Sequence, residues 1–467
     1  MQLAEDVTQP LGAPSPGSIV GRLERIPFTR THLRVAAILG TGTFFDAFDL
    51  LAIGIALTVV LTTFHMSFAA AGILISGAYA GQFVGGLVFG SLSERYGRKP
   101  AFIAALAVFG ACALFAAFAT SMQQLLIARV VQGLGLGAEV PLAGAMFNEF
   151  VRGRSRGKIV MAYEGMFVWG LFVAPLAGMI LFRLLSPDLG WRVLFAVGAI
   201  PLVVALIAIK ALPESPRWLA EQGRVAEADA IVGAFERDAQ RAGTVLEAPV
   251  AVRLSGKPTD FGELFSPTYR ARTWMSYALW FTTYFAMYGY STWLPTLYVK
   301  LGGLPPSASL ALTSLVGAIQ LGAVYVQSAT IDRVGRKPWF IASYVIALVG
   351  TLWGAFAVGV LHLSGWPILF TAGALMGIGA YTSGSAVYLY TPELFPTRMR
   401  VWATTTSASV CRIASTIAPA VVGVFLASAG GIGAVFVMFG IDLAIGLVIF
   451  ARFAIETKGL VLEELAP

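Results

Sequence analysis

Acidic residues inside otherwise apolar stretches are the side chains of this sequence best suited to bind protons. Asp46 and Asp49 are three residues apart, so on a helix both carboxylates project from one face. Two like charges this close resist joint ionisation, which suits the pair to exchanging protons near neutral pH. A charged group facing lipid is costly, so that face should look into a helix bundle. The alternative is a structural role, with the carboxylates held by a neighbouring helix or a cap.

A second acidic position is Glu139, between Gly137 and Pro141, where backbone hydrogen bonding is interrupted and a side chain can reach a cavity. Glu139 is therefore a further candidate for proton coupling. Arg129 is expected to pair with an acid of the first apolar stretch, and structural and coupling roles are both open for it. Glu164 is another coupling candidate, or else belongs to an ion-pair network at the membrane surface.

Arg412 is the candidate for substrate binding. A guanidinium stays charged and presents a planar fork of donors that fits a carboxylate. Its position in an apolar stretch therefore favours binding of an organic anion. The alternative is that an acid such as Asp442 neutralises it.

Aromatic residues are dense between residues 273 and 298, and four of them share one helical stripe. Polar-tipped rings on such a stripe would stack on a planar ligand if they faced a cavity. The four are Tyr277, Phe281, Tyr284 and Tyr288. Gln320 and Tyr388 add neutral hydrogen-bonding groups. Packing in the core or at an interface is the alternative for each ring.

The elements that must position these residues are membrane-spanning helices. Hydrophobic residues make up 57% of the chain and charged residues 12%, and the mean hydropathy is +0.77. Apolar stretches of about 20 residues each can cross a hydrocarbon core, and continuous runs exclude the alternating strands of a barrel. An all-helical membrane protein with twelve spans is predicted. The spans are 35–62, 69–92, 100–119, 122–148, 158–183, 191–211, 273–298, 307–330, 338–361, 366–390, 400–427 and 431–454.

A short basic turn occurs twice, as ERYGRKP from Glu94 and as DRVGRKP from Asp332. The copies begin 238 residues apart in a chain of 467, as in transporters built from two parallel repeats with the substrate between them. The expected organisation is a cytoplasmic N-terminal segment (1–34), a six-helix half (35–212), a cytoplasmic connector (213–272), a second six-helix half (273–455) and a cytoplasmic tail (456–467). A surface helix is expected over residues 225–242.

Charged pairs beside these turns are expected to act as cytoplasmic latches that break when the protein opens to the cytoplasm and re-form when it closes. The expected pairs are Glu94 with Arg98, Asp332 with Arg336, Glu393 with Arg398, and Glu149 with Arg152 or Arg156.

Charge and motif content limit the function further. The net charge is +7, but the basic residues gather in alternate loops, which predicts cytoplasmic termini and does not indicate nucleic-acid binding. No nucleotide-binding GxxxxGK[ST] motif, no metal-ligand spacing and no signal peptide are evident. Cys112 and Cys411 are expected to be packing residues. Neither an enzyme nor a cofactor is predicted.

Two motifs resemble those of the major facilitator superfamily, and the resemblance extends from about residue 35 to 457. They are GSLSERYGRK at 90–99, with Glu94 where Asp is usual, and RVVQGLGLG at 129–137. PESPRWL at 213–219 and PELFPTR at 392–398 resemble sugar-porter and organic-ion-transporter signatures. FDAFD at 45–49, GAEVP at 137–141, WLP at 293–295, YTPE at 390–393 and Arg412-Ile413 resemble bacterial niacin permeases. Aromatic-acid/proton symporters share the paired Asp.

The resemblance implies a monomeric, multi-pass secondary transporter of the bacterial inner membrane that works by alternating access. The expected substrate is a small aromatic or organic monocarboxylate such as nicotinate or benzoate, carried with protons. Arg at the position of Arg412 is typical of anion carriers among related organic-ion transporters. Transport of sugars, other acidic metabolites or organic cations is the alternative, and a non-transporting membrane sensor is an alternative of another class.

Overall fold

The apolar runs of the sequence fold into long helices, because in lipid the backbone polar groups must be hydrogen-bonded within their own segment. The computed structural model describes residues 15–249, 261–363, 365–395, 399–428 and 430–458. The helices of the N-terminal half are α2 (Arg30–Thr63), α3 (Phe68–Tyr96), α4 (Arg98–Ala117), α5 (Met122–Phe150), α6 (Gly153–Leu184), α7 (Pro187–Val197) and α8 (Ile200–Ala211).

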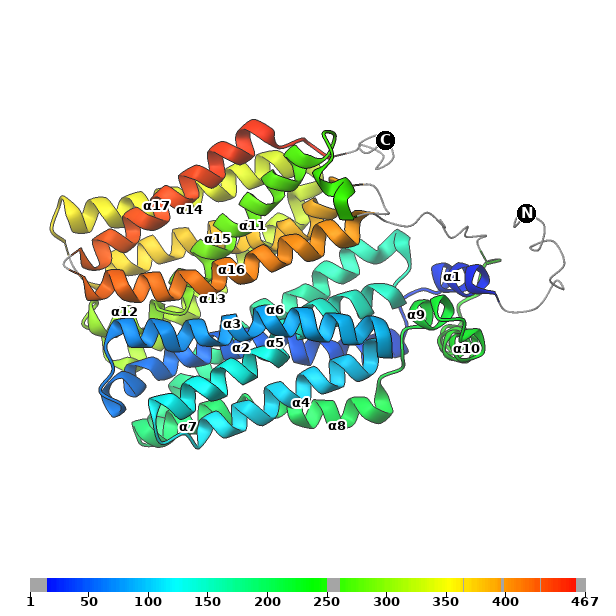
Figure 1. Cartoon of the computed structure of the whole chain (residues 1–467), viewed down its shortest axis with the longest axis horizontal. Helices are drawn as coiled ribbons and strands as arrows, with labels where there is room; N and C mark the ends of the chain where they lie inside the picture. The colour runs from blue at the N-terminus through cyan, green and yellow to red at the C-terminus, as the bar shows by residue number, and fades with distance from the viewer. Residues whose placement is uncertain (1–14, 250–260, 364, 396–398, 429, 459–467) are drawn as a thin grey trace.

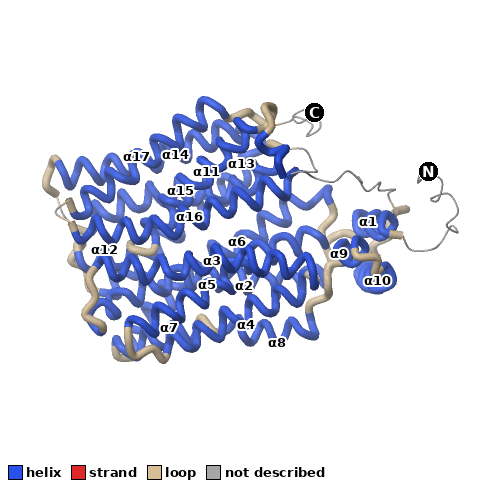
Figure 2. Tube along the Cα trace, in the orientation of Figure 1, coloured by secondary structure: helices blue, strands red, loops and turns tan. Residues whose placement is uncertain are grey.

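The helices of the C-terminal half are α11 (Arg270–Ser291), α12 (Leu294–Lys300), α13 (Pro306–Val334), α14 (Arg336–Gly359), α15 (Trp366–Glu393), α16 (Arg400–Ala427) and α17 (Gly431–Phe453). The two halves lie side by side with their helices nearly parallel (Figure 1), and the described residues form helices and loops (Figure 2). Among the described residues, ten helical segments are long and apolar enough to cross a membrane.

Two predicted spans differ from the structure because each is broken into two helices. The sixth span is divided between α7 and α8 at Gly198, and Pro201 lies in the first turn of α8. The seventh is divided between α11 and α12, with Pro295 in the first turn of α12. Proline fits well in the first turn of a helix, where its missing N–H is not needed, and Pro201 and Pro295 each lie at the start of a new helix that the apolar pattern alone reads as continuous.

The duplicated basic turn has the same backbone in both copies. Gly97 and Gly335 join α3 to α4 and α13 to α14 with φ of 113° and 107°, a region that favours glycine. Glu214 accepts hydrogen bonds from the first backbone N–H groups of α4, and Glu456 does the same for α14. Each copy is therefore capped by a carboxylate that follows the last helix of its own half.

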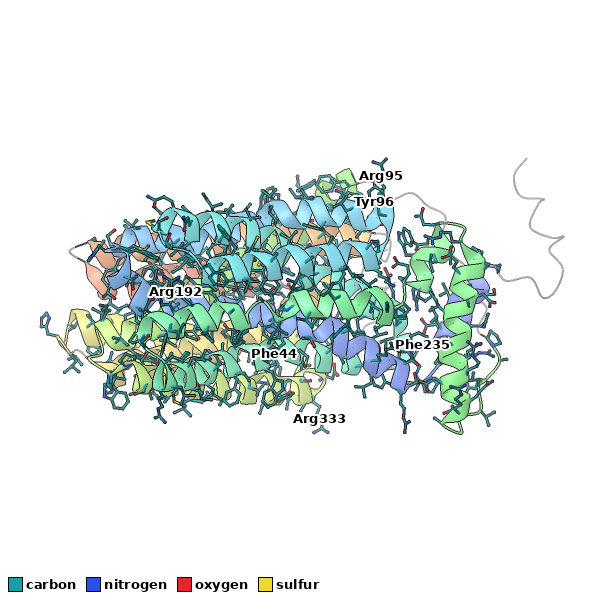
Figure 3. All side chains as sticks on the ribbon, turned by 90° about the horizontal axis from the view of Figure 1, so that it is seen from below. Phe44, Arg95, Tyr96, Arg192, Phe235 and Arg333 are labelled. Atoms are coloured by element: carbon teal, nitrogen blue, oxygen red, sulfur yellow. The ribbon has the colours of Figure 1, made fainter. Side chains whose placement is uncertain are left out.

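A cluster of three helices lies beside one end of the N-terminal half, and we call this end of the bundle the connector end (Figure 1). It consists of α1 (Pro16–Arg25), which the sequence analysis did not predict, α9 (Pro216–Glu221) and α10 (Val225–Arg241), which confirms the predicted surface helix. Phe235 of α10 packs on His32 at the start of α2, with ring centroids 4.7 Å apart (Figure 3). The cluster is thus attached to the N-terminal half.

Ion pairs hold α1 against α10. Arg22 pairs with Asp229 and, at 2.7 Å, with Glu236, which also pairs with Arg25 at 2.6 Å. Burial opposes ionisation of Glu236, but the hydrogen bonds from the two arginines outweigh it and lower the pKa of its carboxyl group. The contacts are consequently formed at neutral pH.

Candidate functional site

The first buried ion pair of the N-terminal half joins α2 to α5. The Arg129 guanidinium donates to both carboxylate oxygens of Asp49 at 2.8 and 2.6 Å, and Gln132 Nε2 donates to the same carboxylate at 2.9 Å. The side chains of Arg129 and Asp49 are 3% and 2% exposed. Arg129 therefore pairs with an acid of the first span, and Asp49 is fully engaged.

Asp46 is placed differently although it lies one turn away on the same helix. It is buried, yet it makes no hydrogen bond or ion pair with any residue that the structure describes. Its main electrostatic neighbours are Arg412 of the other half, Asp49 and Arg129. The two carboxylates predicted to act as a pair thus have separate surroundings, one neutralised at short range and one without a bonded partner.

Glu139 lies deeper in the N-terminal half and is fully buried. Thr43 Oγ1 donates to Glu139 Oε1 at 3.4 Å and lies 2.9 Å from the hydroxyl of Tyr163. Glu139 therefore belongs to a polar group shared by α2, α5 and α6. The side chain of Glu164 lies outside the described residues.

Arg412 reaches across the interface between the halves. Its guanidinium donates to the side-chain oxygen of Gln82 on α3, and Tyr288, Asp46 and Tyr388 are among its electrostatic neighbours. Among the described residues it makes no ion pair within 4 Å. Asp442, the alternative partner, has a buried oxygen without a hydrogen bond and is an electrostatic neighbour of Tyr344.

The aromatic stripe of α11 divides between two environments. Tyr288 lies 5.1 Å from Tyr79 of the N-terminal half and 5.7 Å from Tyr284, centroid to centroid. Tyr284 donates to the Gly384 carbonyl at 3.1 Å, and Trp280 contacts the rings of both Tyr284 and Tyr388. The end of the stripe that contains Tyr288 therefore faces the interface near Arg412.

At the other end of the stripe, Tyr277 and Phe281 contact residues of the C-terminal half. Tyr277 donates to Thr406 Oγ1 at 2.8 Å, and Phe281 stacks on Phe285 at 5.6 Å. Gln320 on α13 donates to the Tyr290 hydroxyl at 2.6 Å, both side chains being buried. Of the predicted substrate-binding residues, Arg412 and Tyr288 contact side chains of the N-terminal half, and Gln320 lines a cavity that Leu51 and Leu171 of that half also line.

The two halves touch closely at the end opposite the connector. Thr296 Oγ1 donates to the Gly54 carbonyl at 3.3 Å, and a side chain at Gly54 would collide with the Thr292 carbonyl oxygen. Trp293 packs edge-on against Phe68 at 5.9 Å. Within the described residues no hydrogen bond or ion pair joins the halves near the connector, and the ribbons of α3 and α16 diverge toward it (Figure 1).

The predicted latches lie at the connector end, inside each half. Arg98 pairs with Glu94 at 2.5 Å and with Glu149 at 3.4 Å. Arg336 pairs with Asp332 at 2.7 Å and Glu393 at 3.0 Å. Arg398 and the side chain of Arg156 lie outside the described residues, and Arg152 of α6's N-cap is half-buried. The two clusters repeat one arrangement in both halves.

Sequence reasoning missed Gln82, Tyr79 and Tyr290 as parts of this region. Gln82 lies in the middle of the second span, and a polar side chain at that depth is itself a signal of an interior role. Tyr79 is one turn earlier on the same face, with its hydroxyl 3.5 Å from Thr292 Oγ1. Tyr290 lies just outside the stripe, so helical spacing alone could not single it out.

Comparison with known proteins agrees with this geometry. The family model for sugar (and other) transporters matches residues 35–467. The chain belongs to this family. Members of the family are transporters, so the chain is a multi-pass membrane transporter of the major facilitator superfamily and not an enzyme, as the sequence analysis predicted.

Similar transporters of the family include proteins with named substrates. The chain is 28% identical to the niacin transporter NiaP of Acinetobacter baylyi, over 96% of this chain and 99% of the relative. It is 30% identical to the 4-hydroxybenzoate transporter PcaK of Pseudomonas putida, over 80% of this chain and 82% of the relative. Relatives of this family therefore carry small organic substrates.

The fold is that of a solved member of the superfamily. The xylose transporter XylE of E. coli, in a partially occluded inward-open conformation, matches with a TM-score of 0.74 at 19% identity, covering 93% of this chain and 100% of that one. The predicted major facilitator fold is thereby confirmed.

Proposed function

We propose that the transporter carries a small aromatic or organic monocarboxylate, such as nicotinate or benzoate, together with protons. The observation that carries the proposal is Arg412. This permanent cation lies between the halves, is held by the neutral amide of Gln82, and has no ion-pair partner among the described residues. A substrate carboxylate would supply the missing charge, and the ring of Tyr288 would stack on a planar substrate. Relatives named for niacin and 4-hydroxybenzoate transport support this substrate class.

Asp46 is the proposed site of the coupled proton. While no anion is bound at Arg412, its positive charge attracts negative charge at Asp46 across the interface. A bound substrate anion would cancel that charge, and the unpaired carboxylate would then take up a proton more readily. Each ligand thereby favours binding of the other, which is the requirement for symport. Binding of an anion at Arg412 would affect Asp49 and Glu139 less, because their hydrogen-bond partners lie within the N-terminal half.

Alternating access is proposed to move the two halves against each other around this site. Contact at the end opposite the connector corresponds to a conformation that is open toward the connector. We place the connector end and both termini in the cytoplasm, by the positive-inside rule, and the protein in the bacterial inner membrane as a monomer. The clusters around Arg98 and Arg336 stay intact within each half in this conformation, so we propose that they stiffen the halves and contact each other when the connector end closes.

Transport of a sugar is the second candidate, favoured by the structural likeness to a xylose transporter. Reconstituted protein distinguishes the two. Labelled nicotinate uptake into liposomes is measured with and without an inward proton gradient, in the presence of benzoate, glucose or an organic cation. Uptake that needs the gradient and is inhibited by benzoate supports the proposal. If glucose is the only competitor that inhibits uptake, or if glucose is transported and nicotinate is not, the substrate is a sugar and the assignment to an aromatic acid is wrong.

A further inference from the structure

A small polar cavity lies at the interface of the two halves, beyond Tyr288 toward the closed end. It is lined from the N-terminal half by Leu51 and Leu171. The remaining wall belongs to α11, α12, α13 and α15, and its polar members are Tyr290, Ser291, Thr313, Gln320 and Tyr381. The cavity therefore has one apolar wall and one wall of neutral hydrogen-bonding groups, without a charged side chain.

Gln320 and Tyr290 are the pair in this cavity with hydrogen-bonding capacity left. One N–H of the Gln320 amide donates to the Tyr290 hydroxyl at 2.6 Å. The other polar groups are largely engaged, since Ser291 and Thr313 donate to carbonyls of their own helices and Tyr381 contacts Ser291. The Gln320 carbonyl, its second N–H and the Tyr290 hydroxyl proton remain available within the described residues.

A glycine leaves the space that this pair of side chains occupies. A Cβ atom at Gly377 of α15 would collide with both Gln320 Nε2 and the Tyr290 hydroxyl. Gln320 and Tyr290 therefore pack directly against the backbone of Gly377, and any larger residue at position 377 would displace them. Such a fit holds the amide in one orientation toward the cavity, as a recognition group requires.

Aromatic residues lie between the cavity and the proposed anion site. Tyr79 contacts Tyr288 at 5.1 Å, and Tyr288 is an electrostatic neighbour of Arg412. The Tyr79 hydroxyl also lies 3.5 Å from Thr292 Oγ1, and Thr292 follows Ser291, which lines the cavity. A planar acid lying against Tyr288 with its carboxylate at Arg412 would direct the far side of its ring toward this cavity.

We propose that Gln320, positioned by Tyr290 and Gly377, hydrogen-bonds a neutral polar atom on the ring of the substrate, such as a ring nitrogen or a ring hydroxyl. The inference rests on the proposed function, because it assumes an aromatic carboxylate at Arg412. It deepens that function by making ring-substituted acids preferred over benzoate. A buried neutral hydrogen bond changes affinity by up to about ten-fold.

The test is the affinity ratio of polar-ring acids to benzoate in reconstituted protein. Wild type is expected to prefer nicotinate or 4-hydroxybenzoate by about ten-fold. Gln320→Leu should bring the ratio close to one while benzoate affinity stays within about two-fold of wild type. Gln327→Leu removes another buried amide of α13, bonded to Ser385, and should keep the wild-type ratio. Comparing the two polar-ring acids shows whether a ring acceptor or a hydroxyl is read.

Gly377→Ala is an independent test, because the added methyl group displaces the Gln320 amide without removing it. The same loss of preference is expected, with benzoate uptake as the evidence that the variant is folded and active. No preference in wild type, or an unchanged preference in either Gln320→Leu or Gly377→Ala, would overturn the subsite. Absence of binding and uptake of every aromatic acid by wild type would instead overturn the proposed function.

Discussion

The pairing of Asp49 with Arg129 leads to a prediction that separates a structural carboxylate from a coupling one. Both side chains are almost completely buried, and four hydrogen bonds join them to each other and to Gln132. Arg129→Gln would leave the Asp49 charge inside the membrane without its cation. Removing one partner of such a pair costs about 3–5 kcal/mol, because the remaining charge is uncompensated.

This cost should be visible as a loss of thermal stability. For a cooperative unit of about 150–250 residues, such as one six-helix half, 1 kcal/mol shifts the melting temperature by about 2–4 °C. The Arg129→Gln variant should therefore melt about 6–20 °C below wild type in detergent. The double variant Asp49→Asn/Arg129→Gln removes both charges and should recover most of the loss, since a neutral pair leaves no buried charge.

Two comparisons make the prediction refutable. Arg224→Gln breaks an exposed ion pair with Glu227 on the connector surface and should leave the melting temperature unchanged. Asp46→Asn removes a carboxylate without bonded partners among the described residues and should not lower it either. If Arg129→Gln has the melting temperature of wild type, or if the double variant is no more stable than the single one, the buried pair does not hold α2 to α5.

Three further perturbations test other parts of the account. Arg412→Ala should weaken binding of an aromatic acid by about 10–150-fold, because a hydrogen bond to a charged group is lost; unchanged affinity in equilibrium binding would remove Arg412 from the site. Gly54→Ala should lower uptake by preventing contact with Thr292, whereas Gly322→Ala, which adds a methyl group to open space, should not; equal uptake by the two would show that this contact is dispensable. Glu236→Gln should speed hydrogen exchange of residues 16–25, while Glu227→Gln on the same helix should not. Because the pKa of Glu236 is lowered, wild type should lose the exchange protection of residues 16–25 only as the pH falls through that pKa, below the ordinary range of a glutamate. If Glu236→Gln leaves this protection unchanged, the ion pairs do not hold α1 in place.

Much of the architecture could be predicted because membrane helices are recorded in the sequence as runs of apolar residues. The predicted spans agree with α2 to α6 and α13 to α17 within a few residues, apart from the longer starts of α2 and α6. The breaks near Gly198 and Trp293 were missed, because hydropathy averages over a window and does not register one interrupted turn. Helix α1 was missed for the opposite reason, since its stability comes from contacts with α10, more than 200 residues away.

The candidate site was predictable in its residue types but not in its pairings. Charges at Asp46, Asp49, Arg129 and Arg412 stand out in apolar sequence, yet spacing cannot tell which carboxylate Arg129 takes. The structure resolves this because Asp49 faces α5, leaving Asp46 toward the interface. Gln82, which bonds Arg412, comes from the other half of the chain, and no local pattern connects residues 330 positions apart.

The most direct test of the central claim compares accumulation with exchange for Asp46→Asn in liposomes. Wild type should concentrate labelled nicotinate against its gradient when a proton gradient is imposed, and should also exchange nicotinate when none is imposed. Asp46→Asn should keep the exchange and lose the accumulation, because the substrate site remains while the coupled proton has no carrier. Proton-driven accumulation by Asp46→Asn at the wild-type level would contradict the account.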